Sequence, residues 1–406
     1  MEKFGLIGRT LKHSYSKKIH ALLGDYVYDL IELEPESVAD FAKNGGYTGY
    51  NVTIPYKKDI MPCLDVIDDS AKKIGAVNTV VFRDGVKTGY NTDFDGMRYM
   101  FSRAGIELLG KKVLILGSGG TSNTSVAVAK YLGARKVIVV SRSGENNYEN
   151  LDRHFDADVI INTTPVGMYP NNYQSPIDLA PFKNLSGVAD AIYNPDTTYL
   201  TCQAKLMGVR YTNGLPMLVA QAKFAMEHFF NKKVSDDVIE KVLSTLSKET
   251  LNVVLVGMPG SGKSTVGKAV ADALNREFID TDQEIVNRDG RDIPTIFKES
   301  GEDYFRALEK QVLKDVGKLT GKVIATGGGV IKDKENYFPL KSNGKIFWIK
   351  RDIESLVTDG RPLSKDLETV KKLFEERKDK YATFADFVID NDKDLVSAVE
   401  GVIEKL

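Results

Sequence analysis

The sequence predicts an α/β protein of two or three domains. Strand-like apolar runs alternate with helical patterns from the N-terminus onward, which is typical of parallel α/β sheets. Two glycine-rich loops, GSGGTS at 117–122 and GMPGSGKST at 257–265, each follow a short apolar run. A chain of 406 residues is too long for one ordinary hydrophobic core, so each loop is expected to belong to a core of its own.

The first half of the chain contains two series of predicted strands. An early series precedes the first glycine loop, and a later series surrounds that loop with the spacing of a nucleotide-binding sheet. The predicted strands are FGLIG (4–8), GYNVTIP (49–55), AVNTVVF (76–82), VLILG (113–117), KVIVVS (136–141) and DVIINT (158–163). The predicted helices cover 124–132, 216–230 and 235–248.

A new domain is predicted to begin with a strand at Asn252, and its boundary lies at 248–251 without a Gly/Ser/Pro-rich linker. The helix after the second loop carries one apolar stripe, formed by Val266, Ala269, Val270, Ala273 and Leu274. This stripe must pack on a sheet of the same domain. The predicted strands of that sheet are NVVLVG, REFIDTD, KVIATGGG, KIFWIK and DFVID, with Trp348 in the core.

Composition and charge narrow the classes of function. A net charge of -1 with 27% charged residues leaves no basic surplus for nucleic acid, so small-molecule substrates are the expected partners. No segment approaches the roughly 18 apolar residues of a membrane span, and the start lacks a signal peptide, so we expect no membrane association and a cytoplasmic location. Cys63 and Cys202 are expected to be reduced packing residues, and the four histidines show no metal-ligand spacing. No sequence pattern indicates an oligomeric state.

The first glycine loop is expected to bind a dinucleotide. Gly117, Gly119 and Gly120 leave room for a pyrophosphate at the start of a helix, and the third glycine of the usual fingerprint is replaced by Ser122. Arg142 follows the next predicted strand, where an NAD-binding site usually has a carboxylate. An arginine at this position favours the 2′-phosphate of NADP.

The second loop predicts a nucleoside triphosphate with magnesium. Its pattern places backbone amides around the β-phosphate, Lys263 on the β- and γ-phosphate oxygens, and Ser264 on the metal ion. The loop does not identify the group that receives the phosphate. Two carboxylates, three arginines and a second glycine turn downstream suit a polar acceptor that carries a carboxylate.

Four segments of the early region concentrate hydroxyls, amides, one lysine and one acid, which suits a polyhydroxylated ligand. They are 13–16 (HSYS), 51–58 (NVTIPYKK), 76–79 (AVNT) and 91–93 (NTD). Singly, each is more typical of a turn or a helix cap. Together with GSGGTS, NTTPVGM (162–168) and NGLPMLVAQA (213–222), they resemble shikimate dehydrogenases in content and order over residues 1–248.

That resemblance implies NADPH-dependent reduction of 3-dehydroshikimate to shikimate. It divides this half into a substrate-binding domain over 1–93, completed by 215–248, and a Rossmann-like NADP-binding domain over 94–214. Lys57 and Asp93 would be the catalytic pair. Substrate would be bound by Ser14, Ser16, Asn51, Thr53, Asn78, Tyr193 and Gln221, and NADP(H) by Gly117, Ser118, Gly119, Gly120, Thr121, Ser122, Arg142, Thr163 and Gly214.

This half departs from the resembled family in two places. The segment after the second cofactor strand is SRS where the family commonly has NRT, which retains the arginine. Residues 144–157 are shorter than the family's usual insertion of a helix, a strand and a helix. We therefore expect the cofactor sheet to lack a peripheral element.

Residues 251–406 resemble shikimate kinases. The resemblance rests on the phosphate loop and on DTD (280–282), GEDYFR (301–306), TGGG (326–329), RPL (361–363) and ER (376–377), in that order. It implies a P-loop kinase domain with a parallel sheet, and a lid near 355–368 whose arginine is Arg361. The stretch before Arg361 is shorter than usual and lacks the additional arginine often placed against adenine.

The resemblance also implies roles for single residues of this half. Asp282 would bind the acceptor hydroxyls and take the proton, Arg306 and Arg377 would hold the carboxylate, and Gly328 and Gly329 would contribute amides. Arg361 and Lys263 would neutralise charge on the transferring phosphoryl group. ATP would be bound by Gly260, Ser261, Gly262, Lys263, Ser264 and Thr265, and Mg²⁺ by Ser264 and Asp280.

The resulting hypothesis is a bifunctional enzyme whose first site makes the substrate of its second. Two alternatives remain open on the sequence. One half could be a binding or regulatory module that has lost turnover, or the P-loop domain could phosphorylate a different small molecule such as a sugar acid or a nucleotide.

Overall fold

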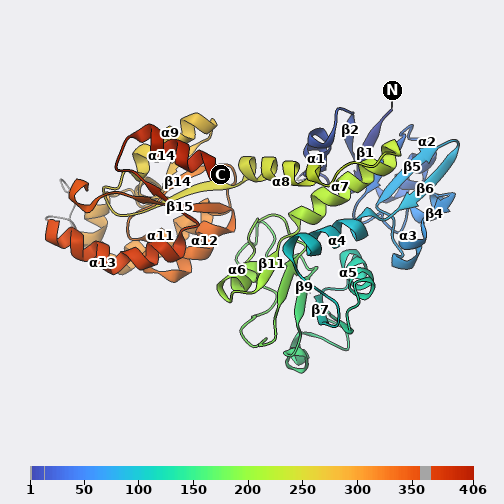
Figure 1. The fold of residues 1–406 in the computed structure, drawn as a ribbon, viewed down its shortest axis with the longest axis horizontal. Coiled ribbons are helices and arrows are strands. Elements are labelled where there is room, and N and C mark those ends of the chain that lie inside the picture. Colours follow the sequence, from blue (N-terminus) through green and yellow to red (C-terminus); the bar gives the residue numbers. More distant parts are fainter. Residues whose placement is uncertain (1, 13, 357–366) are drawn as a thin grey trace. The chain divides into compact units, whose positions relative to one another are not determined.

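The computed structural model describes residues 2–12, 14–356 and 367–406, and the chain divides into two compact units. The first unit comprises Met1–Met168, Gln174–Tyr193 and Leu200–Thr245, and the second comprises Tyr169–Tyr173, Asn194–Tyr199 and Leu246–Leu406. Figure 1 shows the elements of both units. Helix α8 (Asp237–Thr250) ends two residues before strand β12 (Asn252–Val256), so the predicted strand start at Asn252 is confirmed.

The first sheet of the first unit has the strand order β2-β1-β3-β5-β6-β4. Its strands are β1 (Phe4–Gly8), β2 (Tyr28–Glu32), β3 (Gly49–Val52), β4 (Val66–Ile67), β5 (Thr79–Arg83) and β6 (Val86–Tyr90). Its helices are α1 (Ser16–Leu23), α2 (Val38–Asn44), α3 (Asp69–Ile74) and α7 (Leu215–Phe230), with short 3-10 turns at Pro35–Ser37 and Met61–Cys63. The predicted strand at 49–55 is shorter than expected, and the chain turns before Pro55, which has no N–H to donate to a ladder.

This sheet is mixed, whereas the sequence pattern predicted parallel strands. Strand β5 runs antiparallel to both β3 and β6. The β5–β6 hairpin turns through Asp84 and Gly85, whose φ angles of 51° and 80° are those of a tight two-residue hairpin turn. The Asp-Gly pair between two apolar runs was therefore the sequence signal for an antiparallel pair.

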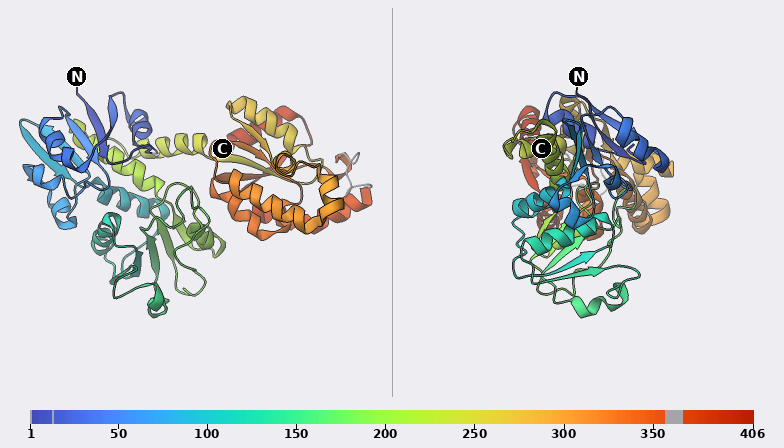
Figure 2. Two further views of the ribbon diagram at one scale, coloured as in Figure 1. Left: turned by 180° about the vertical axis from the view of Figure 1, so that it is seen from behind. Right: turned by 90° about the vertical axis from the view of Figure 1, so that its right-hand side faces the viewer.

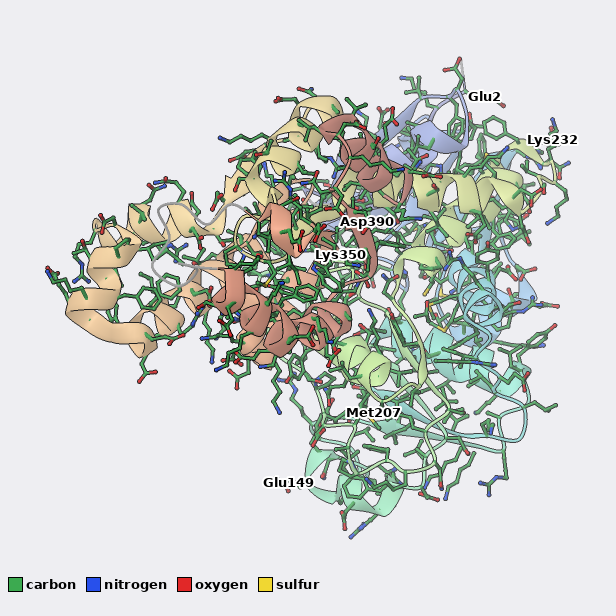
Figure 3. All side chains as sticks on the ribbon, turned by 60° about the vertical axis from the view of Figure 1, so that its left-hand side comes forward. Glu2, Glu149, Met207, Lys232, Lys350 and Asp390 are labelled. Carbon is green, nitrogen blue, oxygen red and sulfur yellow. The ribbon has the colours of Figure 1, made fainter. Side chains whose placement is uncertain are left out.

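The second sheet of the first unit is parallel, with the order β11-β10-β9-β7-β8. Its strands are β7 (Lys112–Leu116), β8 (Lys136–Val140), β9 (Val159–Asn162), β10 (Gly187–Asp190) and β11 (Arg210–Thr212), and its helices are α4 (Thr92–Ala104), α5 (Gly120–Tyr131) and α6 (Tyr199–Leu206). Between β8 and β9 the chain forms a 3-10 segment, Tyr148–His154, which carries Glu149 (Figure 3). Residues 141–158, all described, contain this 3-10 segment and no strand, which agrees with the expectation that the cofactor sheet lacks a peripheral element.

The sheet of the second unit is parallel, with the order β13-β14-β12-β15-β16. Its other strands are β13 (Phe278–Asp280), β14 (Val323–Ala325), β15 (Gly344–Lys350) and β16 (Phe387–Asp390). Helices α9 (Lys263–Leu274) and α14 (Leu395–Glu404) cover one face (Figure 2). The remaining helices are α10 (Thr281–Asp289), α11 (Ile293–Val316), α12 (Tyr337–Ser342) and α13 (Leu367–Phe384), with 3-10 turns at Val330–Lys332, Lys334–Asn336 and Ile353–Ser355.

The apolar residues of the second half pack together in the core that the sequence pattern predicted. Val266 and Val270 of α9 pack with strands β12, β14 and β15 in one buried cluster. Trp348 is 8% exposed, as expected for a core residue of β15. Lys350 and Asp390 lie at paired positions where β15 and β16 end (Figure 3), which is the edge that carries the site loops.

Other expectations from composition also have structural counterparts. Cys63 and Cys202 are free thiols, and Cys202 is buried. None of the described helices combines the length and apolar character that a bilayer span requires.

His20 is a buried neutral side chain in the core of the first unit. Its ring stacks on Tyr28 with centroids 3.7 Å apart, and its Nδ1 lies 2.6 Å from the Tyr26 hydroxyl. Burial lowers the pKa of His20 to about 3, and the neighbouring Asn51 amide opposes this only in part. The imidazole therefore stays neutral in the folded chain across the physiological range.

This burial predicts acid sensitivity of the first unit. Between about pH 3 and pH 6.5 the unfolded chain binds a proton at His20 that the folded chain does not, so the free energy of unfolding falls as the pH falls. The loss is at most about 1.4 kcal/mol per pH unit. In His20→Gln we expect a weaker pH dependence of the urea midpoint for unfolding of the first unit, measured by circular dichroism after equilibration between pH 4.5 and pH 7.5. If the pH dependence is the same in wild type and His20→Gln, buried His20 is not the cause of the acid sensitivity.

Candidate functional site

A cavity of about 320 Å³ in the first unit gathers all the side chains predicted to bind or transform the substrate there. They come from the turn after β1 and the first residue of α1, from β3 and the loop after it, from the residue just before β5, from α4, from the loop after β10 and from α7. They are Ser14, Ser16, Asn51, Thr53, Lys57, Asn78, Asp93, Tyr193 and Gln221. Segments more than 200 residues apart in the sequence therefore form one site.

Lys57 and Asp93 are in direct contact inside this cavity. The Lys57 Nζ atom donates to Asp93 Oδ2 at 2.5 Å, and the two side chains are 23% and 14% exposed. Asp93 lies in the first turn of α4, where the helix dipole favours a carboxylate. The backbone of Lys57 is fixed because its carbonyl accepts from Val77 N–H and because the neighbouring Tyr56 ring is buried.

The start of α4 is held by the strand segment that also lines the cavity. Asn91 caps the helix by accepting from Phe94 N–H, and its own Nδ2 donates to the Ala76 carbonyl. Asn78 Oδ1 accepts from Thr92 N–H at 2.7 Å. The position of Asp93 thus depends on side chains of the 76–79 segment.

Asn51 is less free to bind a ligand than its place in the cavity suggests. Its Nδ2 donates to the Asn78 carbonyl and to Thr79 Oγ1, and its Oδ1 accepts from Tyr28 Oη at 2.7 Å. An amide has two N–H donors, so only an acceptor lone pair remains for a ligand. Asn51 therefore lines the cavity, but most of its hydrogen bonds are made to neighbouring residues of the sheet.

Tyr193 and Gly214 lie beside each other in the fold. Gly214 N–H donates to the Ile192 carbonyl, and a Cβ atom at Gly214 would collide with the Ala191 carbonyl oxygen, so only glycine fits there. Tyr193 packs against Tyr15, with ring centroids 5.3 Å apart. Burial raises the pKa of Tyr193, which keeps its hydroxyl protonated and able to donate.

The first glycine loop lies where the strand order of its sheet reverses. Chain order runs outward from β7 to β8 on one side and to β9 on the other, and ligands of such sheets bind at this point. Gly117 has φ 102°, and a Cβ there would lie 2.7 Å from Thr163 Oγ1, at the end of the neighbouring strand. The two strand ends therefore meet at the loop.

This loop has the features of a pyrophosphate site. Gly119 caps α5 without a side-chain acceptor, and a Cβ at Gly119 or Gly120 would have no atom within 4 Å. The first helical N–H groups and the space above them fit an anionic group. Ser118, Thr121 and Ser122 belong to the same turn, and Arg142 is exposed just after β8, which pairs with β7.

The second glycine loop joins β12 to α9 with the backbone that the motif requires. Gly260 and Gly262 have φ 85° and 88°, and Gly262 caps α9 without a side-chain acceptor. Ser261 Oγ is buried without a hydrogen-bond partner among the described residues. These groups fit a phosphate chain. Lys263 Nζ donates to the carbonyls of Gly257 and Met258.

Ser264 and Asp280 form the pair predicted to hold magnesium. Ser264 Oγ donates to Asp280 Oδ2 at 2.8 Å, and the other carboxylate oxygen of Asp280 accepts from Asp282 N–H. Both side chains border a cleft of about 690 Å³ that Asp282 also lines. Two protein oxygens fit Mg²⁺, which usually takes its remaining ligands from phosphate and water.

The acceptor residues of the second unit meet around the TGGG turn. A Cβ at Gly327 would lie 2.6 Å from Asp282 Oδ1, and one at Gly329 would lie 2.6 Å from Arg306 Nη2. Arg377 Nη1 donates to the Gly328 carbonyl at 2.9 Å. The same Gly328 lies against Pro259 of the phosphate loop, so the predicted acceptor and phosphate residues share one site.

The sequence interpretation missed two acidic partners of Arg306. Arg306 Nη1 donates to Glu309 Oε2 at 2.8 Å, and its Nε and Nη2 donate to Glu302 Oε1. Burial alone would lower the pKa of Arg306, but these carboxylates outweigh it and raise that pKa. Gly301, with φ 82°, kinks α11 just before Glu302, and the spacing 302, 306, 309 then places all three on one helix face.

Arg361 and most of the expected lid, residues 357–366, lie outside the described residues. Asn391, which follows β16, donates from Nδ2 to the Ser261 carbonyl at 2.9 Å. The loop after the last strand therefore contacts the phosphate loop.

Comparison with known proteins decides the family. Residues 6–80 match the family model for the shikimate dehydrogenase substrate binding domain. A shikimate dehydrogenase (NADP(+)) from Clostridium perfringens (strain SM101 / Type A) is 34% identical over 267 residues, which cover 61% of this chain and 98% of that protein. The chain belongs to the shikimate dehydrogenase family.

Solved shikimate dehydrogenases share the fold of this part. A chorismate mutase/shikimate 5-dehydrogenase fusion protein from Clostridium acetobutylicum is 35% identical, with a TM-score of 0.58, and covers 61% of this chain and 97% of its own. A shikimate 5-dehydrogenase from Thermus thermophilus in complex with NADP(H) and shikimate is 26% identical, with a TM-score of 0.54. The match covers 60% of this chain and 99% of that protein.

The second unit contains a domain of another family. Residues 259–406 match the family model for shikimate kinase. A shikimate dehydrogenase part and a shikimate kinase domain make the chain a bifunctional shikimate-pathway enzyme. The two sites described above lie one in each part.

Replacement of Glu309 is expected to weaken binding of the acceptor in the kinase site. Its side chain is 2% exposed and is the buried partner of Arg306. Glu309→Gln keeps the shape but removes the charge, so we expect the KM for the acceptor to rise about tenfold, as for loss of a charged hydrogen bond. The exposed Glu400→Gln on α14 is the matched control. Steady-state kinetics in which both variants retain the wild-type KM would contradict this role.

Proposed function

We propose that the cavity of the first unit reduces 3-dehydroshikimate to shikimate with NADPH, and that the site of the second unit phosphorylates shikimate with ATP and Mg²⁺. The observation that carries the first assignment is the Lys57–Asp93 contact inside a cavity lined by amides and hydroxyls. Relatives named as NADP(+)-dependent, and one solved with NADP(H) and shikimate, support the cofactor and the ligand. We extend this to domains at 1–93 with 215–248, 94–214 and 251–406.

The residues of the first site divide the reduction between them. NADPH, when bound, supplies the hydride that reaches the carbonyl carbon. Lys57 donates the proton to the carbonyl oxygen, so that one C–H bond and one O–H bond form. Asp93 holds the lysine ammonium in place and orients the ring. Ser14, Ser16, Thr53 and Gln221 bind the polar groups of the substrate.

The residues of the second site position an acceptor and stabilise charge. ATP with Mg²⁺ supplies the phosphoryl group. Asp282 accepts the proton of the attacking hydroxyl, and Lys263 turns from the loop carbonyls toward the phosphate oxygens. Arg306 and Arg377 hold the acceptor carboxylate beside the TGGG turn. Ser264 and Asp280 contribute oxygen ligands to the metal ion.

The alternatives are less well supported. A half that had lost turnover would not need its catalytic contacts, yet Lys57 contacts Asp93 and Ser264 contacts Asp280. A kinase for an acceptor without a carboxylate would not need Arg306 and Arg377 at the same glycine turn as Asp282, whereas a sugar acid would also fit these arginines. The match of residues 259–406 also favours shikimate.

A coupled assay of the full chain tests the proposal. With 3-dehydroshikimate, NADPH and MgATP, we expect one NADPH oxidised and one ATP consumed for each substrate molecule. Without NADPH, ATP consumption should wait until shikimate is added. Phosphorylation of a sugar acid or a nucleoside monophosphate in preference to shikimate would contradict the assignment of the second site. A lack of NADPH oxidation with 3-dehydroshikimate would contradict the assignment of the first site.

Arg142 is expected to set the preference for NADP. Arg142→Ala removes a cation that follows β8, so the KM for NADPH should rise about ten- to hundredfold, the effect of losing charge-assisted hydrogen bonds. The KM for NADH, which has no 2′-phosphate, should change little. Arg153→Ala, an exposed arginine on the neighbouring 3-10 segment, is the control. An equal rise in the KM for NADPH and the KM for NADH would mean that Arg142 does not contact the 2′-phosphate.

A further inference from the structure

Lys12 is a second cation on the wall of the dehydrogenase cavity. It lies in the turn between β1 and α1 and lines the cavity together with Ser14 and Ser16. Among the described residues, Lys12 and Lys57 are the basic side chains that line it. Lys57 is held by Asp93 at 2.5 Å, so its charge is already paired.

The charge of Lys12 is not paired within the described residues. Its side chain is exposed, and no hydrogen bond or ion pair of its ammonium joins it to another described residue. The nearby carboxylate of Glu32 accepts from Leu11 N–H at 2.7 Å instead. A free ammonium in the lining of a polar cavity is positioned to receive an anionic group.

The side chains of Ser14 and Ser16, beside Lys12, are uncharged, and Ser14 Oγ already takes part in one hydrogen bond. Ser14 Oγ accepts from Ser16 N–H at 3.2 Å, which leaves its O–H free to donate. Neutral hydroxyls can orient a carboxylate through charge-assisted hydrogen bonds, but they do not neutralise its negative charge, which an ammonium group does. A carboxylate bound by the serines alone would lack a cationic partner, because Lys57 is engaged with Asp93.

We propose that Lys12 is the cationic partner of the substrate carboxylate in the dehydrogenase site. This rests on the proposed function, which supplies a substrate with one carboxylate. Lys12 binds and does not take part in proton transfer, because Lys57 fills that role. Its loss therefore changes substrate affinity and leaves turnover intact.

The test is steady-state oxidation of shikimate with NADP⁺ by the full chain. Lys12→Gln should raise the KM for shikimate about tenfold with kcat within about twofold, and Lys12→Arg should restore most of the affinity. The neutral methyl ester of shikimate is the decisive probe, because its KM should be the same in wild type and Lys12→Gln. Lys17→Gln, an exposed lysine on α1 outside the cavity, controls for general loss of charge.

The outcomes separate this proposal from the proposed function. Equal KM changes for shikimate and its ester, or an unchanged KM for shikimate, would overturn the role of Lys12. A wild-type chain without shikimate oxidation would instead overturn the dehydrogenase assignment. The kinase activity of each variant, which is expected to stay at the wild-type value, shows that the second unit is folded, and the retained kcat for shikimate oxidation shows that the first unit is folded.

Discussion

Replacing Lys57 with methionine is expected to lower the rate of 3-dehydroshikimate reduction by about 10²- to 10⁴-fold, the usual contribution of a positioned general acid. Methionine keeps much of the volume of the side chain but cannot donate a proton. The carbonyl oxygen would then gain its proton from water while the hydride is transferred. Shikimate phosphorylation by the same molecules should proceed at the wild-type rate, since Lys57 belongs to the first unit.

The neighbouring lysine provides the control for this variant. Lys58 is exposed and does not line the cavity, so Lys58→Met should reduce 3-dehydroshikimate normally. Both rates are measured on one preparation, from NADPH absorbance and from ATP consumption. A Lys57→Met chain that retains more than a tenth of the wild-type reduction rate would assign the proton transfer to another group.

Replacing Lys263 with methionine is expected to lower shikimate phosphorylation by about 10²- to 10³-fold, the typical effect of removing one preorganised charged contact to a transition state. Lys263 is 8% exposed and is surrounded by the carbonyls of its own loop. Charge on the transferring phosphoryl group would then lack its ammonium partner, while the backbone amides of the loop remain.

The matched control lies on α11 of the same unit. Lys298 is exposed, and Lys298→Met should phosphorylate shikimate at the wild-type rate. Reduction of 3-dehydroshikimate should be unaffected in both variants. Near-normal phosphorylation by Lys263→Met would contradict the assignment of the 257–265 loop as the catalytic phosphate site.

The local motifs of both halves could be identified from the sequence because backbone geometry restricts them. A glycine at φ 102° after β7, or at φ 88° before α9, has few substitutes. The strands around these loops are continuous apolar runs, which is typical of parallel strands buried on both faces. The positions of the strands beside the two loops were therefore predicted, whereas β2, β4, β6, β10 and β11 were not predicted.

Contacts that depend on tertiary packing could not be predicted in the same way. Glu309 is one of many acids on a charged helix, and only the folded structure shows that it is buried against Arg306. Asn51 was predicted as a substrate-binding residue from the resemblance to shikimate dehydrogenases, yet most of its hydrogen-bonding capacity serves Tyr28, Asn78 and Thr79. The antiparallel β5 was missed although Asp84-Gly85 carried a usable turn signal.

The described residues of each site belong to a single unit. The cavity around Lys57 uses residues of the first unit only, and the residues around Asp282 and Lys263 all belong to the second. A defect in one site therefore leaves the other intact on the same polypeptide. Two alleles that encode Lys57→Met and Lys263→Met should complement each other in one cell, because shikimate released by one gene product can be phosphorylated by the other.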